Sequence, residues 1–311
     1  MRVIVRPLSD VQFGGRPMSD AASASPVLLR QAGESLLGRV ETIEVGGFDL
    51  SEICPSGAPC RAETVTRFWL RGGFPRSYLA ASDDDSLVWR PQAIARHVEV
   101  ELPQFGIQIA APARLRFWKM LAHFHGQIWS AADPARSLSV SEPTVRRYLD
   151  TLTQTLMVRQ LQPWHVNACQ AAGEVAQGVF QRRRLAARTD GGHDARRTAG
   201  AFALRGRAGR VFALEQVLRV AKPDEAYFWA THQGAELDLL LFKGGRRAGV
   251  EFRRADASSV TRSMQIAGED LQLDALNVVY PGDKRFRMAP GIEAVPLWAL
   301  FESAGSPVRF K

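Results

Sequence analysis

The stretch that decides the fold is "GAELDLLLFKGGRRAGVEFRRAD", residues 234–256. Paired glycines accept the positive φ that a tight hairpin turn needs, so Gly244-Gly245 predicts a turn between two antiparallel strands. Opposed residues then have numbers that add to 489, as 244 and 245 do. In this register Asp238 faces Glu251, and Glu236 faces Arg253.

Side chains alternate in direction along a strand, so these four polar residues are expected on one face of the hairpin. The other face is apolar and holds Leu237, Leu239, Leu241, Ala248, Val250 and Phe252. Two opposed carboxylates with Cβ atoms roughly 4.5–5.5 Å apart repel each other unless a cation lies between them. Asp238 and Glu251 therefore predict a weak Mg²⁺ site. The alternative is an amphipathic hairpin with a solvated polar face and a Glu236–Arg253 ion pair.

The composition is that of a folded protein with an anionic partner. The 311 residues are 46% hydrophobic and 23% charged, with a formal net charge of +8. The charge favours nucleic acid as a partner. No apolar run is long enough for a transmembrane helix, and three cysteines (54, 60 and 169) favour a reducing cytoplasm over structural zinc.

Residues 113–168 follow the pattern of a winged helix-turn-helix. A helix from Ala113 is expected to bury Leu115, Trp118, Leu121 and Ile128 on one face. Next come a short helix (130–138), a turn, a second helix (142–156) and the strand "MVRQLQPW" (157–164). The second helix is expected to direct Val145, Tyr148, Leu149 and Leu152 inward. Its early residues Arg146 and Arg147 are the nucleic-acid-binding candidates, although such domains also serve as protein spacers.

Several phrases together resemble one family: "SASPVLLRQAGESLLGR" (23–39), "LRGGFPRSYLAASDDDSLVWR" (70–90), "GQIWSAADPARSLSVSEPTVRRYLDTL" (126–152) and "FWATHQGAELDLLLFKGGRRAGVEFRRAD" (228–256). The chain is identified as a member of a prokaryotic group of AAA-superfamily ATPases with a C-terminal domain of unknown function. The resemblance implies an ATPase core, a winged helix and a restriction-endonuclease-like PD-(D/E)XK fold.

The chain departs from this family at the nucleotide site. No Gly-x-x-x-x-Gly-Lys-Ser/Thr phosphate loop occurs in its sequence. ATP is the cofactor of the family, but binding and hydrolysis by this chain alone are not expected.

A second departure is the segment 171–210, which has nine arginines and no lysine. Codons GAA GTC GCC CAA GGT GTA TTT for 174–180, read without the first base, give Lys-Ser-Pro-Lys-Val-Tyr, the phrase of the family. We hypothesise that this segment is translated out of frame; the alternative is a divergent insertion. Its apolar neighbours are too few to bury a face, so we expect disorder or only loose packing.

By the resemblance, Glu215, Asp238 and Glu251 occupy the catalytic acid positions of the nuclease-like fold, and Asp238 and Glu251 are its metal ligands. Arg253 stands where the family has a catalytic lysine. An arginine keeps the positive charge but cannot release its proton, so the water-activating step is expected to be impaired. The site is therefore interpreted as degenerate.

The sequence thus predicts an α/β multi-domain chain. Its parts are a C-terminal remnant of a P-loop ATPase core (1–47), a helical connector (48–112), a winged helix-turn-helix (113–168), an aberrant Arg-rich segment (169–210) and a restriction-endonuclease-like α/β domain (211–311).

The expected function of this truncated, frame-damaged chain is binding of nucleic acid or protein without catalysis, or none if the gene is a pseudogene. Two alternatives remain open. One is an ATP-dependent, Mg²⁺-dependent nuclease-like protein acting with a separate ATPase half, and the other is a module that binds only protein. Neither a membrane nor a small-molecule substrate is indicated.

Overall fold

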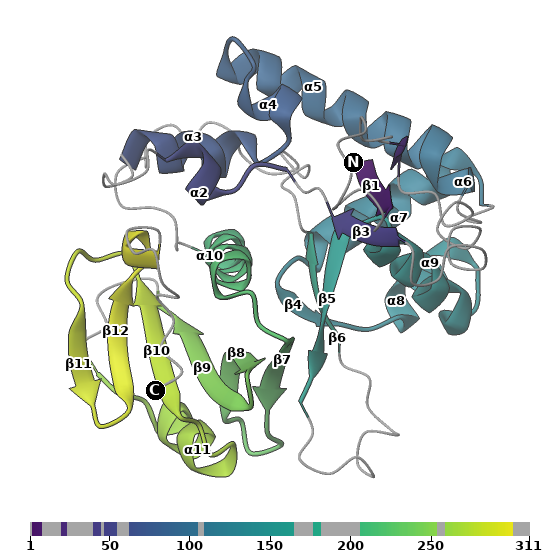
Figure 1. The fold of residues 1–311 in the computed structure, drawn as a ribbon. Coiled ribbons are helices and arrows are strands. Elements are labelled where there is room, and N and C mark those ends of the chain that lie inside the picture. Colours follow the sequence, from purple (N-terminus) through teal and green to yellow (C-terminus); the bar gives the residue numbers. More distant parts are fainter. Residues whose placement is uncertain are drawn as a thin grey trace.

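The computed structural model describes residues 2–7, 20–23, 40–44, 47–54, 62–104, 109–164, 177–181, 206–253 and 259–300. The protein is an α/β protein in which a helical N-terminal region precedes a mixed sheet (Figure 1). Residues 1–47 were expected to be an ATPase remnant. Of these residues, the structure describes three strands and Gly47. These strands form a small antiparallel sheet in the order β2-β1-β3: β1 (Arg2–Pro7), β2 (Asp20–Ser23) and β3 (Val40–Glu44).

The large sheet has the strand order β11-β12-β10-β9-β8-β7-β5-β6-β4. Its first seven strands form the mixed part, in which β10 is parallel to β9 and β12, and β7 is parallel to β5. The bounds are β4 (Gln127–Trp129), β5 (Val158–Pro163), β6 (Gln177–Gln181), β7 (Glu225–Ala230), β8 (Glu236–Lys243), β9 (Arg246–Phe252), β10 (Ala275–Tyr280), β11 (Phe286–Ala289) and β12 (Ile292–Pro296).

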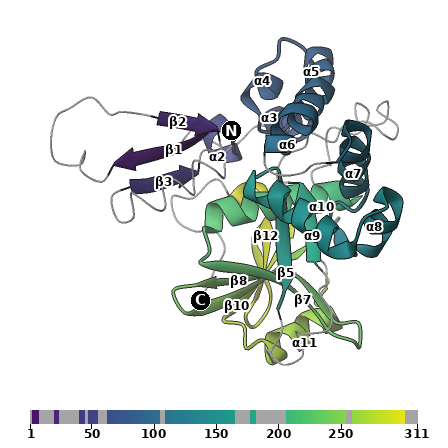
Figure 2. The ribbon, with the colours of Figure 1, turned by 90° about the vertical axis from the view of Figure 1, so that its right-hand side faces the viewer.

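One helix covers each face of this mixed sheet (Figure 2). On the first face, α10 (Gly206–Ala221) packs Val211, Leu214 and Val217 into a core with β8 and β9. On the second face, α11 (Arg262–Asp270) packs Met264 and Ala267 into another core with β8 and β10. Both faces of β8 are thus buried, which explains its largely apolar sequence.

The structure confirms the hairpin predicted from Gly244-Gly245. The two glycines have φ of 55° and 77°, so both adopt the conformation that favours glycine. The paired residues run from Lys243↔Arg246 to Leu239↔Val250, which is the predicted register.

The predicted apolar face is wrong at Leu237, because β8 contains a bulge. β7 pairs Tyr227 with Leu240 but Trp229 with Leu237, so two residues of β8 oppose one of β7. The extra residue interrupts the alternation of side chains. Leu237 consequently packs with Leu240 on the α11 side, whereas Leu239 packs on the α10 side.

Residues 111–163 and 177–181 form a helix–strand–helix–helix–strand–strand unit. Its helices are α7 (Ala111–His123), α8 (Ala132–Leu138) and α9 (Glu142–Gln154), and its strands pair antiparallel in the order β5-β6-β4. The four side chains predicted to point inward from α9 are buried: Val145, Tyr148, Leu149 and Leu152. The prediction for Ile128 is wrong, because this residue lies in the edge strand β4 and is 61% exposed.

The helical N-terminal region contains α2 (Leu50–Ile53), α3 (Ala62–Arg71), α4 (Pro75–Tyr78), α5 (Asp83–Arg96), the π-helix η2 (His97–Glu101) and α6 (Leu102–Gln104); a 3-10 turn η4 (Trp298–Leu300) follows the last strand. Ser82 is the N-cap of α5 in a capping box with Asp85. Among the described residues, no helix is long and apolar enough to cross a membrane. Cys54, at the end of α2, is disulfide-bonded, which differs from the free thiol expected in a reducing compartment.

Part of the Arg-rich segment has regular backbone structure. Residues 177–181 form β6, which pairs with both β4 and β5, and residues 206–210 begin α10. The expectation of disorder is therefore wrong for these two stretches, because the sheet and the core of α10 supply their partners. The remaining residues of 171–210 lie outside the described part of the chain.

A close backbone crossing joins the start of the connector to the turn after α3. The Phe48 amide donates to the Gly73 carbonyl oxygen at 2.7 Å. A Cβ on Gly73 would lie 2.5 Å from the Phe48 carbonyl oxygen, a backbone atom that cannot rotate away. Glycine is therefore needed at this crossing for steric reasons.

We predict that Gly73→Ala lowers the free energy of unfolding by about 1–3 kcal/mol, because the two backbone segments must move apart. Urea denaturation of the purified chain measures the change. Gly268→Ala is the control: Gly268 lies in α11 with no atom within 4 Å of an added Cβ. This control should be neutral or stabilising by up to about 1 kcal/mol. Equal effects of the two substitutions would contradict the steric account.

Candidate functional site

Asp238 lies in the bulge of β8, and both of its carboxylate oxygens accept hydrogen bonds. Arg210, in the first part of α10, donates from Nη1 to Oδ1 at 2.9 Å. The backbone amide of Phe252 donates to Oδ2 at 3.0 Å. The described pairing of β8 with β9 stops at Leu239↔Val250, so the carboxylate continues the contact between the strands by a side-chain bond.

Glu251 lies in β9, one residue before this amide, and is partly buried. Burial raises the pKa of Glu251 to about 8, and the nearby Asp238 carboxylate acts in the same direction. Arg253 and a backbone hydrogen bond from Asp238 oppose the shift. Burial also raises the pKa of Asp238, against the opposing effect of Arg210. At neutral pH the pair therefore holds a proton, which we place on Glu251 because Asp238 has the arginine and the amide as partners.

Arg253 lies just after β9 and donates its backbone amide to the Val279 carbonyl oxygen of β10 at 2.9 Å. Its Nη2 atom is buried and has no hydrogen-bond partner among the described residues, and the same holds for Oε2 of Glu251. Glu236, predicted to face Arg253, is exposed and pairs with Ala230 of β7. The described salt bridges do not include a Glu236–Arg253 pair.

Glu215 lies in α10 and is 5% exposed. Arg159 of β5 donates from Nε to its Oε1 at 2.7 Å, while Oε2 is buried without a hydrogen-bond partner among the described residues. Glu215 is carried by α10, which docks on the sheet. Its carboxylate, however, is engaged by an arginine from the neighbouring unit.

The structure therefore brings Asp238, Glu251 and Arg210 together. Within the described part of the chain, no three His, Cys, Asp or Glu side chains are grouped so that they could hold a metal ion. A divalent cation at Asp238 would have to displace Arg210 from Oδ1.

The nucleic-acid candidates lie in another part of the protein, on α9. Arg147 is exposed, and the side chain of Arg146 is 37% exposed with Nη2 3.7 Å from Oε2 of Glu142. The opposite face of this helix is buried through Val145 and Leu149. Both arginines thus lie on the open side of a docked helix.

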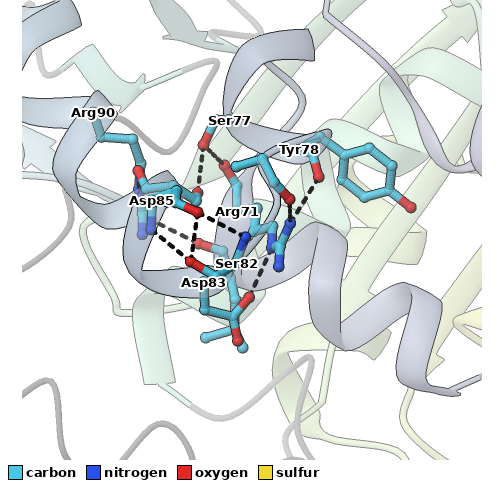
Figure 3. Close-up of polar contacts among 10 residues, drawn as sticks. Arg71, Ser77, Tyr78, Ser82, Asp83, Asp85 and Arg90 are labelled. Atoms are coloured by element: carbon cyan, nitrogen blue, oxygen red, sulfur yellow. Dashed lines mark hydrogen bonds and ion pairs between the residues drawn. The ribbon is translucent and has the colours of Figure 1, made fainter.

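A third polar cluster lies within residues 70–90, one of the stretches that resemble the family, and has a structural role (Figure 3). Arg71 donates to Oδ1 of Asp83 at 2.7 Å and to the Tyr78 and Ala80 carbonyl oxygens. Buried Arg90 donates to the Leu70 carbonyl oxygen at 2.9 Å. These bonds satisfy backbone groups of the turn between α3 and α5, so the arginines hold the turn in place.

Sequence reasoning missed the two arginines that bind the acids. Arg210 belongs to the segment expected to be disordered, and Arg159 is separated from Glu215 by 56 residues. Only the docking of α10 on the sheet brings these charges to the acids, and no local pattern in the sequence signals it.

Two parts of the chain match known domain families. Residues 62–176 match the domain of unknown function DUF8612, and residues 211–300 match the domain of unknown function DUF4143. The chain carries both domains. The DUF4143 match includes Glu215, Asp238 and Glu251. Arg210 lies one residue before the matched range.

The chain is homologous to two mycobacterial proteins: uncharacterized protein Rv2008c of Mycobacterium tuberculosis and uncharacterized protein Mb2031c of Mycobacterium bovis. Each is 41% identical over 305 residues, which covers 95% of this chain and 64% of the relative. The chain thus spans somewhat less than two thirds of the length of these relatives. Neither the names of the relatives nor the descriptions of the domains mention an ATPase. No solved structure matches the chain.

The raised pKa of Glu251 predicts a pH-dependent stability. The Glu251 carboxyl has an ordinary pKa of 4.5 and a pKa of about 8 in the folded protein. Between these two pH values, the folded state therefore binds a proton that the unfolded state has released. The stabilising contribution is complete below about pH 4.5 and is lost as the pH rises through 8. Glu251→Gln cannot ionise, so its stability relative to wild type should rise by about 1–3 kcal/mol from about pH 5 to pH 9.

Chemical denaturation at a series of pH values measures this difference. Glu269→Gln, in the exposed part of α11, is the control and should follow the wild-type profile. Parallel profiles for Glu251→Gln and wild type would show that the carboxyl has its ordinary pKa.

Proposed function

We propose that this chain binds nucleic acid without catalysis, through α9 of a winged helix-turn-helix, with the DUF4143 domain as a nuclease-like scaffold. The observation that carries the proposal is the open side of α9, where Arg146 and Arg147 lie in the first half of a helix whose other face is buried. In helix-turn-helix proteins, the early residues of the second helix contact bases and phosphates.

The arrangement around α9 supports a winged-helix assignment. α8 and α9 are separated by a short turn in which Ser139 has a φ of 55°, and Ser141 caps α9. The strands β5 and β6 follow as an antiparallel pair, with β4 on the other side of β6. A helix pair followed by a hairpin is the arrangement that such domains use.

The arrangement of the DUF4143 domain is similar to a restriction-endonuclease-like fold. β7, β8 and β9 form an antiparallel meander, β10 adds in parallel to β9, and α10 and α11 cover the two faces. Arg253 argues against hydrolysis, because an arginine at this position carries charge but cannot take or release a proton. A lost general acid–base contribution is typically about 10²–10⁴-fold in rate.

Two other functions would give different results. A nuclease-like protein that depends on Mg²⁺ and on an ATPase half from another chain would nick supercoiled DNA with metal once that half is added, and Asp238→Ala would abolish nicking. A module that binds only protein would show no DNA binding that weakens with salt. ATP is not part of the proposed function of this chain by itself.

We predict that the double variant Arg146→Ala/Arg147→Ala weakens binding to a duplex oligonucleotide, because phosphate contacts are lost. For each lost contact, the slope of log K against log salt should decrease by about one unit. Fluorescence anisotropy of a labelled duplex at several salt concentrations measures both quantities.

The matched control removes two other exposed arginines, at the hairpin tip and at the start of α11: Arg246→Ala/Arg262→Ala. It changes the net charge equally and should leave most of the affinity and slope intact. If the two double variants lose affinity equally, binding depends on overall charge and α9 is not the contact surface.

A further inference from the structure

The resemblance to nucleases implies a divalent cation at the acids of the DUF4143 domain, and the residues of this chain do not fit one. Mg²⁺ needs carboxylate oxygens that are free to face it, usually one or two groups together with several waters. Here both oxygens of Asp238 already accept hydrogen bonds, from Arg210 and from the Phe252 amide. One oxygen of Glu215 accepts from Arg159.

The two arginines come from different elements and reach their acids from different directions. Arg210 connects α10 to the bulge in β8, whereas Arg159 connects β5 to α10. The acid partners are the buried members of both pairs, with side-chain exposures of 12% for Asp238 and 7% for Glu215. A buried carboxylate needs a counter-ion, because removing its charge from water costs several kcal/mol without one.

We infer that Arg210 and Arg159 take the place of a divalent cation as counter-ions in this domain, and that their ion pairs fasten α10 to the sheet. This inference rests on the proposed absence of catalysis, but not on the proposed DNA binding. α10 is thereby connected at Arg210 to β8 and at Glu215 to β5, the strand that also belongs to the winged-helix unit.

The ion pair between Arg210 and Asp238 is expected to prevent metal binding. While Arg210 is present, its guanidinium competes with any cation for Oδ1 of Asp238. Once it is removed, Asp238 keeps one free oxygen next to Glu251, which itself has an oxygen without a hydrogen-bond partner among the described residues. After Glu251 releases its proton to water, these two carboxylates are sufficient ligands for a weak Mn²⁺ or Mg²⁺ site.

The experiment titrates MnCl₂ into the purified full chain and follows the electron paramagnetic resonance signal of free Mn²⁺. We expect wild type to leave the free signal unchanged in the submillimolar range. Arg210→Gln should remove Mn²⁺ from solution with a stoichiometry near one, and Arg210→Gln/Asp238→Asn should lose this binding. Arg285→Gln is the matched control, since it breaks the 2.7 Å pair with Glu293 in the same domain and should behave as wild type.

Stability provides a second readout that does not depend on metal binding by a variant. The Tm of wild type should be unchanged by Mg²⁺ or EDTA, whereas Arg159→Gln and Arg210→Gln should each lower it by about 5–10 °C. Mn²⁺ binding by wild type that Asp238→Asn abolishes would overturn the inference. So would an Arg210→Gln protein that is folded and binds no Mn²⁺. Neither result would affect the salt-dependent DNA binding expected of α9, so the two proposals can fail separately.

Discussion

A single extra residue in β8 determines the character of the acidic site. The bulge that opposes two residues of β8 to one of β7 leaves Leu237 on the α11 side and Leu239 on the α10 side. Between them, the Asp238 carboxylate reaches both Arg210 and the Phe252 amide. Bulges commonly redirect a side chain in this way. Without the bulge, regular alternation would separate Asp238 from the face that α10 covers.

β5 connects the mixed sheet to the neighbouring unit that contains α9. It pairs with β6 on one side and with β7 on the other, so one strand belongs both to the helix-and-strand unit that contains α9 and to the mixed sheet. The Arg159–Glu215 ion pair adds a side-chain connection next to this shared strand. In the proposed function, a nuclease-like domain without metal chemistry would then serve to hold α9 and its arginines in a fixed position.

Local patterns in the sequence were sufficient for much of the fold. The Gly244-Gly245 turn fixed the hairpin register, and the apolar spacing in α9 identified its buried face, because both depend on neighbours within a few residues. The bulge and the exposure of Ile128 depend on contacts with distant strands, which no local pattern reports. The partners of the acids were missed for the same reason: Arg159 and Arg210 reach Glu215 and Asp238 only after α10 has docked. The acids of the candidate site could therefore be proposed from the sequence, but their electrostatic partners could not.

The central claim is that arginine, and not a metal ion, is the counter-ion of Asp238. A crystal of the chain soaked in MnCl₂ and measured at the manganese absorption edge tests it most directly. We predict no anomalous peak between Asp238 and Glu251, with the Arg210 guanidinium still donating to Asp238. An anomalous peak bridging the two carboxylates, with Arg210 displaced, would contradict the account.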